Sequence, residues 1–115
     1  MRVSGMRFIL GAAFVGWAGT ASLAFAAGVD EEAAQALARK SGCLKCHSTT
    51  RDKEGPSYRK VAEKFKGKAD AEQELTKFLT SPSKVKVDGK EEMHKQLDTK
   101  DAAAIKNVVG WILTR

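Results

Sequence analysis

Apolar residues recur at helical spacing in four stretches of the chain, separated by segments that lack this period. A repeat of apolar residues every three to four positions indicates a helix with one buried face. The four predicted helices cover about residues 31–40, 58–66, 70–80 and 100–113. Because strand patterns are nearly absent between them, the sequence predicts a small all-α domain.

Residues typical of helix ends bound these stretches. Asp30, Asp70 and Thr99 precede three of them and are residue types that cap helix N-termini. Gly42 follows the first stretch, as is common at helix C-termini, and Pro82 ends the third. Local signals and periodicity therefore agree on where the helices lie.

The segment 83–97 is the least periodic part of the chain after the N-terminal region. Val85 and Val87 alternate with lysines, as in an extended strand, and Asp88-Gly89 is a turn signal. We therefore expect an extended segment and a turn between the third and fourth helices.

Residues 1–26 have the layout of a secretory signal peptide. Arginines come first, an uncharged apolar run follows, and small residues flank a predicted cleavage position after Ala26. The apolar run is slightly shorter than the ~20 residues that a spanning helix needs. We predict cleavage, which leaves 27–115 as one domain without stable membrane insertion; an uncleaved anchor is the alternative.

The chain holds 20 lysines and arginines against 14 aspartates and glutamates, a net charge of +6. Removal of the two arginines in residues 1–26 lowers this charge to +4. The lysines are scattered, and no dense basic stripe carries interleaved aromatic residues, so nucleic-acid binding is not expected. A modest basic surface suits an acidic protein partner, although a plain solvated surface is the commoner reason for scattered lysines.

Cys43, Cys46 and His47 form a C-x-x-C-H motif, the attachment signature of a c-type haem. Each cysteine sulfur adds to one vinyl group of the porphyrin, and the adjacent histidine reaches the iron from one side. A covalent porphyrin also supplies apolar surface on which a small domain packs its helices. The motif therefore predicts one covalent haem c.

Three other interpretations of the motif stay open at this point. A redox C-x-x-C belongs with a thioredoxin-like βαβ pattern, which the flanking sequence does not show. A structural zinc site needs four N or S ligands, and beyond position 26 the chain offers only Cys43, Cys46, His47 and His94. A disulfide between the two cysteines would close a very short loop and constrain the chain little.

Taken in order, these features resemble the small bacterial class I cytochromes c. The similarity runs through Cys43-Leu44-Lys45-Cys46-His47, then Gly55-Pro56-Ser57-Tyr58, then residues 61–67, and finally residues 107–113. It covers essentially all of 27–115 and implies about four helices wrapped around one haem.

The resemblance also implies roles for individual residues. Cys43 and Cys46 would carry the haem, and His47 would be the proximal iron ligand. The backbone carbonyl of Pro56 would accept a hydrogen bond from the other nitrogen of His47, which fixes the orientation of the ring. From composition alone, Gly55-Pro56 is an ordinary turn.

The family usually supplies a sixth iron ligand from a methionine in the loop before the last helix. Met93 is the one methionine beyond position 26, and His94 follows it where the family pattern has proline. Adjacent residues on an extended segment point opposite ways, so only one of these side chains can face the iron. We take Met93 as the predicted ligand and His94 as its alternative.

The function implied by the resemblance is transfer of single electrons in the periplasm by a haem iron that alternates between Fe³⁺ and Fe²⁺. Its partners would be periplasmic redox proteins, or terminal oxidases and reductases, with acidic docking patches. The alternatives are a haem subunit of a larger oxidoreductase and a haem with an open sixth site for a small ligand. No catalytic constellation stands out in the sequence, so an enzyme is not predicted.

Overall fold

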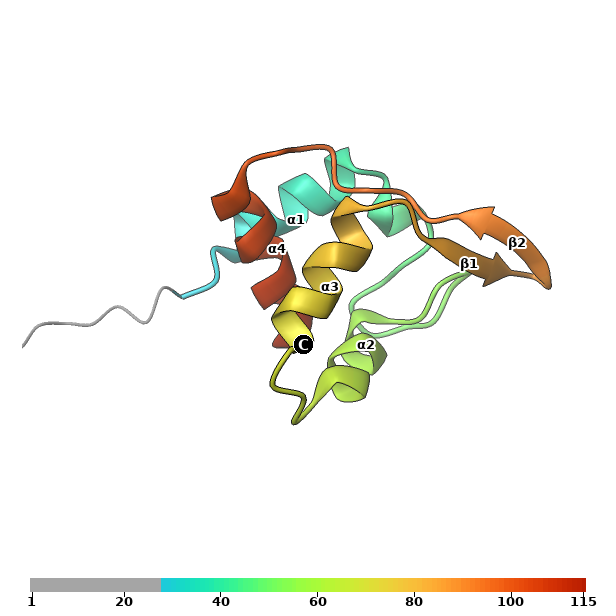
Figure 1. Cartoon of the computed structure of the whole chain (residues 1–115), viewed down its shortest axis with the longest axis horizontal. Helices are drawn as coiled ribbons and strands as arrows, with labels where there is room; N and C mark the ends of the chain where they lie inside the picture. The colour runs from blue at the N-terminus through green and yellow to red at the C-terminus, as the bar shows by residue number, and fades with distance from the viewer. Residues whose placement is uncertain (1–27) are drawn as a thin grey trace, which may run out of the picture.

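The computed structural model describes residues 28–115, so the predicted signal peptide lies outside the described residues. Its elements are, in chain order, α1 (Glu31–Lys40), the 3-10 turn η1 (Cys43–Lys45), α2 (Tyr58–Phe65), α3 (Ala71–Thr80), β1 (Lys84–Val87), β2 (Lys90–Met93) and α4 (Ala102–Leu113). The helices gather into one body, and the two strands project from it as a hairpin (Figure 1). The predicted all-α fold class is confirmed, with one small hairpin added. No helix within 28–115 is long and apolar enough to cross a membrane.

The N-terminal end of α1 is capped as the sequence predicts. The Asp30 carboxylate accepts a hydrogen bond from the backbone N–H of Ala33 at 3.0 Å. After the helix, Gly42 takes the left-handed conformation, with φ of 77°, and turns the chain into η1. This conformation favours glycine because a side chain would clash with the backbone there.

Two other predicted caps differ from the structure. Asp70 stands at the N-terminus of α3, but its side chain makes no capping hydrogen bond. The prediction of Thr99 as the N-cap of α4 is wrong. Asp101 caps α4 by accepting from the N–H of Ala103 at 3.0 Å, while the Thr99 hydroxyl accepts from the N–H of Asp101 at 3.1 Å. Thr99 lies too far before α4 to reach its free N–H groups and instead shapes the turn that leads into the helix.

The core lies where α1 packs on α4. Ala34 and Ala38 are completely buried on α1, and Val109 and Trp111 of α4 are at most 1% exposed. The side-chain amide of Asn107 makes two hydrogen bonds with the backbone of Asp30, which caps α1. It accepts from the N–H of Asp30 and donates to the carbonyl of Asp30, each at 2.8 Å. These contacts join the first and last helices of the domain.

The hairpin confirms the predicted extended segment and turn, and β2 adds a second strand that the sequence pattern did not indicate. The antiparallel register pairs Lys84 with Met93 at the base and Val87 with Lys90 next to the turn. Asp88 and Gly89 have φ of 50° and 79°, which matches the tight turns that join twisted antiparallel strands. The hairpin therefore delivers the chain back to the helical body directly after Met93.

Candidate haem site

The C-x-x-C-H motif follows α1 directly and folds as one tight turn. The backbone N–H groups of Cys46 and His47 both donate to the carbonyl of Cys43, at 3.2 and 3.0 Å. Both cysteines are free thiols, so the disulfide interpretation finds no support. Nor do three or more His, Cys, Asp or Glu side chains in residues 28–115 converge on a metal position, which disfavours a structural zinc site.

The electrostatic surroundings of the two thiols differ from those of a redox-active pair. Burial raises the pKa of Cys43, and a hydrogen bond with Tyr58 opposes this only in part. Burial and then the Glu54 carboxylate raise the pKa of Cys46, whose thiol donates to Glu54 at 3.4 Å. Reactive C-x-x-C cysteines have lowered pKa values, so this site does not have the character of a thioredoxin-like centre.

His47 is held in one orientation by the chain that follows it. Its Nδ1 lies 2.6 Å from the backbone carbonyl of Pro56. Since a carbonyl only accepts, Nδ1 carries the proton, and the lone pair of Nε2 is left for a metal. The sequence placed these residues nine positions apart, and the structure brings them into direct contact.

Gly55 has a steric role that the sequence pattern did not reveal. A methyl group on its Cα would lie 2.5 Å from Cε1 and 2.9 Å from Nδ1 of His47. Carbon atoms in contact normally lie about 3.5–4.0 Å apart, so only glycine leaves space for the imidazole in this position. The Gly-Pro pair is therefore a fitted support for the ring as well as a turn.

The loop between the motif and α2 is fixed at several points. The N–H of Gly55 donates to the carbonyl of Cys46 at 2.8 Å, and the N–H of Tyr58 donates to that of Ser48 at 2.9 Å. Asp52 accepts a hydrogen bond from the N–H of Ser57 at 2.9 Å and forms an ion pair with Lys60 of α2. Its pKa lies below the usual value, mainly because of the hydrogen bond with Lys60 and then because of the bond from Ser57. An aspartate in a polar loop carries no distinct signal, so this role of Asp52 cannot be predicted from the sequence.

Aromatic rings connect His47 to the core. Tyr58 stacks on His47 with centroids 5.3 Å apart and an interplanar angle of 19°. On its other side Tyr58 meets Trp111 edge to face, with centroids 5.2 Å apart. Tyr58 is 4% exposed, and burial together with the nearby Cys43 raises the pKa of its hydroxyl. The ring that would bind iron is thus backed by buried, uncharged groups of α2 and α4.

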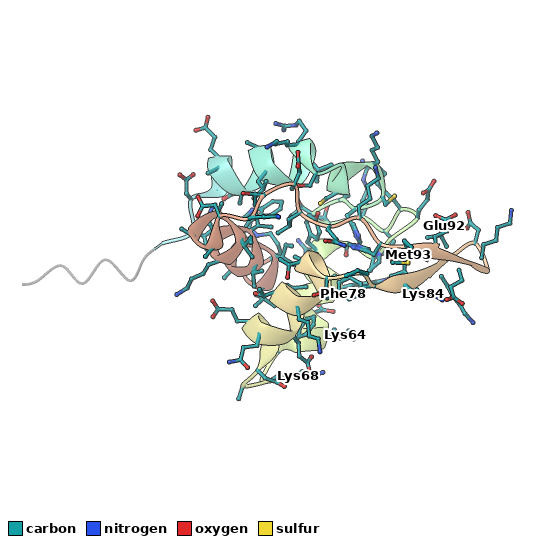
Figure 2. The ribbon with its side chains drawn as sticks, turned by 45° about the horizontal axis from the view of Figure 1, so that its top comes forward. Lys64, Lys68, Phe78, Lys84, Glu92 and Met93 are labelled. Carbon is teal, nitrogen blue, oxygen red and sulfur yellow. The ribbon has the colours of Figure 1, made fainter. Side chains whose placement is uncertain are left out.

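Met93 and His94, the two candidates for the sixth iron ligand, differ in their exposure and in their contacts. Met93 is 56% exposed at the base of the hairpin (Figure 2). His94 is half-buried, packs against Phe78 with centroids 4.7 Å apart, and lies 6.0 Å from His47 between ring centroids. Burial and then His47 lower the pKa of His94. Met93 as the sixth ligand stays a prediction, and the position of His94 makes it a direct competitor.

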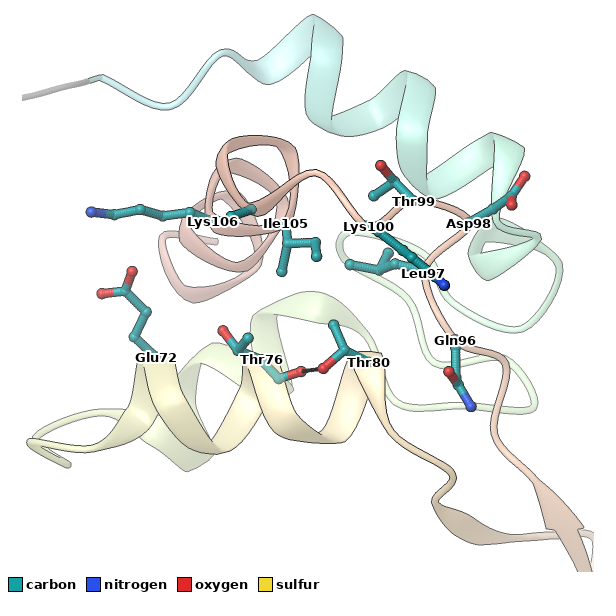
Figure 3. A pocket seen from close by; sticks show the side chains of 11 residues that line it. Glu72, Thr76, Thr80, Gln96, Leu97, Asp98, Thr99, Lys100, Ile105 and Lys106 are labelled. Carbon is teal, nitrogen blue, oxygen red and sulfur yellow. Dashed lines mark hydrogen bonds between the residues drawn. The ribbon is translucent and has the colours of Figure 1, made fainter.

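The structure also has a surface groove away from this site. It is lined by α3, α4 and the segment between the hairpin and α4, and the Thr80 hydroxyl donates to the Thr76 carbonyl on its wall at 2.8 Å (Figure 3). None of the residues that line it is a cysteine, histidine or methionine. A smaller hollow lies beside His47, lined also by Leu44 and Asp52. Of the two hollows, only the smaller one includes a residue of the motif that could bind a metal, His47; neither is lined by Cys43, Cys46 or His94.

Comparison with known proteins bears on the family. No family model matches the chain. Cytochrome c2 of Rubrivivax gelatinosus is 37% identical over 78 residues, which cover 67% of this chain and 91% of that protein. The class 1 cytochrome MtoD of Sideroxydans lithotrophicus ES-1 is 53% identical, with a TM-score of 0.72 over 75% of this chain and 96% of MtoD. The chain belongs to the small class I cytochromes c. Cytochrome c552 of Nitrosomonas europaea has the same fold at 26% identity and a TM-score of 0.56, over 70% of this chain and 96% of that one.

Membership of this family means that the cytochrome carries one covalent haem c and is a haem-based electron carrier. Its own residues fit such a group. Gly55 leaves room for the proximal ring, the Pro56 carbonyl orients it, and the Nδ1 of His94 on the other side is buried without a hydrogen-bond partner in the described structure.

Proposed function

We propose that the cytochrome is a periplasmic carrier of single electrons, with its haem attached through Cys43 and Cys46. His47 would be the proximal iron ligand, and the carbonyl of Pro56 would orient it. The observation that carries this proposal is the 2.6 Å contact between Nδ1 of His47 and that carbonyl, because it presents Nε2 at the motif in a fixed tautomer. A bound haem supplies the exchange of one electron between Fe³⁺ and Fe²⁺.

The proposed location rests on the N-terminal sequence. Residues 1–26 have the layout of a cleaved leader, and 27–115 would then be the carrier domain. Attachment of haem c in bacteria takes place in the periplasm, so the motif and the leader point to the same compartment.

What the chain contributes to electron transfer is rigidity around the proximal ring. The stacked Tyr58, the fitted Gly55 and the accepting carbonyl of Pro56 each restrict a different movement of His47. A ligand that moves little between oxidation states keeps the reorganisation of the site small. We propose a carrier and not an enzyme, because protein ligands on both faces of the iron would leave no position for a substrate.

The proposed partners are redox proteins, including terminal oxidases and reductases, that present acidic patches to exposed lysines. Lys45 and Lys86 are exposed, and neither has an ion pair among the described residues. Lys53 donates a hydrogen bond to the carbonyl of Leu44 at 3.0 Å, and Lys84 forms an ion pair with Glu91 of β2 at 2.8 Å. The ion pair therefore partly neutralises the charge of Lys84, whereas Lys53, bonded to a neutral carbonyl, keeps its charge available for docking.

The first test of this proposal is attachment of the haem. Wild-type protein should retain haem on a denaturing gel stained for haem, and Cys46→Ser should retain little and be less stable, because one thioether is lost. Thr50→Ala, an exposed position three residues after the motif, is the control and should stain like wild type. Complete extraction of haem from the wild type by acidic acetone would contradict the proposal.

The second test is electron exchange with an acidic redox protein, followed by stopped-flow absorbance. Opposite charges attract over about 10 Å at 0.1 M salt and are screened beyond that distance. The rate should therefore fall as ionic strength rises, and Lys86→Gln should weaken this dependence. A rate that does not change with salt would contradict docking through charge and would favour a permanent subunit of a larger oxidoreductase.

A further inference from the structure

We propose that Lys53 and Glu54 tune the reduction potential of the haem through opposite charges held at the C-x-x-C-H motif. The positive charge of Lys53 raises the potential, and the negative charge of Glu54 lowers it. This inference rests on the proposed attachment of haem at the motif. It names two residues that help to determine which donors can reduce the carrier and which acceptors can oxidise it.

Three consecutive residues of the loop after the motif bond back to the motif. The Nζ of Lys53 donates a hydrogen bond to the carbonyl of Leu44 at 3.0 Å. The carboxylate of Glu54 accepts one from the thiol of Cys46 at 3.4 Å. The backbone N–H of Gly55 donates to the carbonyl of Cys46 at 2.8 Å. The loop thus places one positive and one negative side chain directly against the segment that carries the haem.

The position of Glu54 does not depend on its bond to the thiol. When the Cys46 sulfur bonds to the inner vinyl carbon, its S–H bond breaks and the proton passes to the outer carbon, with no net oxidation or reduction. The thioether can then no longer donate to Glu54. The backbone bond from Gly55 to Cys46 remains, and the N–H of Lys53 donates to the carbonyl of Gly55 at 3.0 Å. These bonds keep residue 54 at the same edge of the motif after attachment.

The two charges have no ion-pair partners. Neither Lys53 nor Glu54 forms an ion pair with any residue in 28–115. Asp52, the other acidic residue of the loop, pairs with Lys60 of α2. Lys53 also lines the hollow beside His47. Each charge therefore acts on the haem without an opposite charge bound to it.

The direction of each effect follows from Coulomb's law. Oxidation of the iron from Fe²⁺ to Fe³⁺ adds one positive charge to the site. A carboxylate close to the haem stabilises this charge and favours the oxidised form, whereas an ammonium group disfavours it. Both side chains are exposed, so dissolved ions screen both interactions. The two effects oppose each other, and both should weaken as ionic strength rises.

Redox titration of the full-chain holoprotein, followed by visible absorbance, tests this inference. At 0.01 M salt the screening length is about 30 Å. Under these conditions Glu54→Gln should raise the potential, Lys53→Gln should lower it, and the double variant should lie between the two single variants. At 1 M salt, where the screening length is about 3 Å, both shifts should shrink.

Two matched controls separate a local effect from a change in net charge. Glu72→Gln and Lys106→Gln remove the same charges from the walls of the groove between α3 and α4, which no residue of the motif lines (Figure 3). Each control should shift the potential less than the variant of the same charge at the motif. Equal shifts at both places, no shift from either loop variant, or shifts of the opposite sign would overturn the inference.

A denaturing gel stained for haem distinguishes this failure from failure of the proposed function. Covalent haem in the wild type and in every variant shows that attachment holds. A failure of the potential to respond as expected then counts against the two charges alone. Wild-type protein without covalent haem would contradict the proposed function, and with it the inference that rests on it.

Discussion

Replacement of Gly55 by alanine would test the fit between the Gly-Pro turn and the proximal histidine. The added methyl group would lie 2.5 Å from Cε1 of His47, at least about 1 Å inside normal carbon–carbon contact. Either the loop or the imidazole must move by roughly that distance. Because Nδ1 of His47 is 2.6 Å from the carbonyl of Pro56, a movement of this size breaks their hydrogen bond.

The expected cost follows from three terms. Overpacking a well-fitted site costs about 1–3 kcal/mol. Loss of the hydrogen bond to Pro56 adds about 0.5–1.5 kcal/mol. Alanine also stiffens the unfolded chain, which opposes these losses by about 0.4–1 kcal/mol where the backbone accepts it. We therefore expect the free energy of unfolding of Gly55→Ala to fall by about 0.5–4 kcal/mol.

Denaturant unfolding of the oxidised holoprotein, followed by circular dichroism, measures this change, and a redox titration measures the effect on the haem. The potential should rise, because an imidazole without its acceptor is a weaker donor to iron. Gly67→Ala is the control: its methyl group meets no atom within 4 Å, but φ of 78° makes the backbone strained. It should lose about 1–2 kcal/mol with no change in potential. A Gly55→Ala protein as stable as wild type, with an unchanged potential, would refute the steric argument.

Two further predictions concern the scaffold. Asn107→Ala removes both hydrogen bonds to the backbone of Asp30 and should lower the free energy of unfolding by about 1–3 kcal/mol; an unchanged denaturation midpoint would show that α1 packs on α4 without them. Asp52→Asn should destabilise the protein at pH 7, because a carboxyl with a lowered pKa stabilises the fold at pH values above its unfolded pKa of about 3.8. The difference from wild type should shrink as pH falls through the folded pKa, and a difference independent of pH would assign the effect to the hydrogen bond with Ser57 alone.

The parts of this structure that depend on local signals could be predicted from the sequence. The four helices follow the apolar period, and Asp30 and Gly42 end α1 as residues of their types commonly do. The turn at Asp88-Gly89 was predicted for the same reason. Local signals do not fix the exact start of a helix. Thr99 and Asp101 are both residue types that cap helices, and only the position at which α4 begins decides between them.

The parts that depend on contacts between distant segments could not be predicted in this way. Nothing in the local sequence shows that Gly55 must leave space for His47, or that Phe78 packs against His94. Met93 and His94 are neighbours, so composition and spacing cannot say which one faces the motif. The position of this segment depends on the pairing of β2 with β1 and on the hydrogen bond from His94 to Ser83, and neither can be predicted from the local sequence.

The packing of α1 on α4 has a consequence for the order in which this molecule is made. Asp30 and Asn107 lie 77 positions apart, and a ribosome produces the N-terminal part of a chain first. The buried face of α1 therefore has no partner until α4, the last of the described elements, has been synthesised. Until α4 is available to close the core, the cysteines directly after α1 stay accessible, so haem attachment does not compete with a finished core.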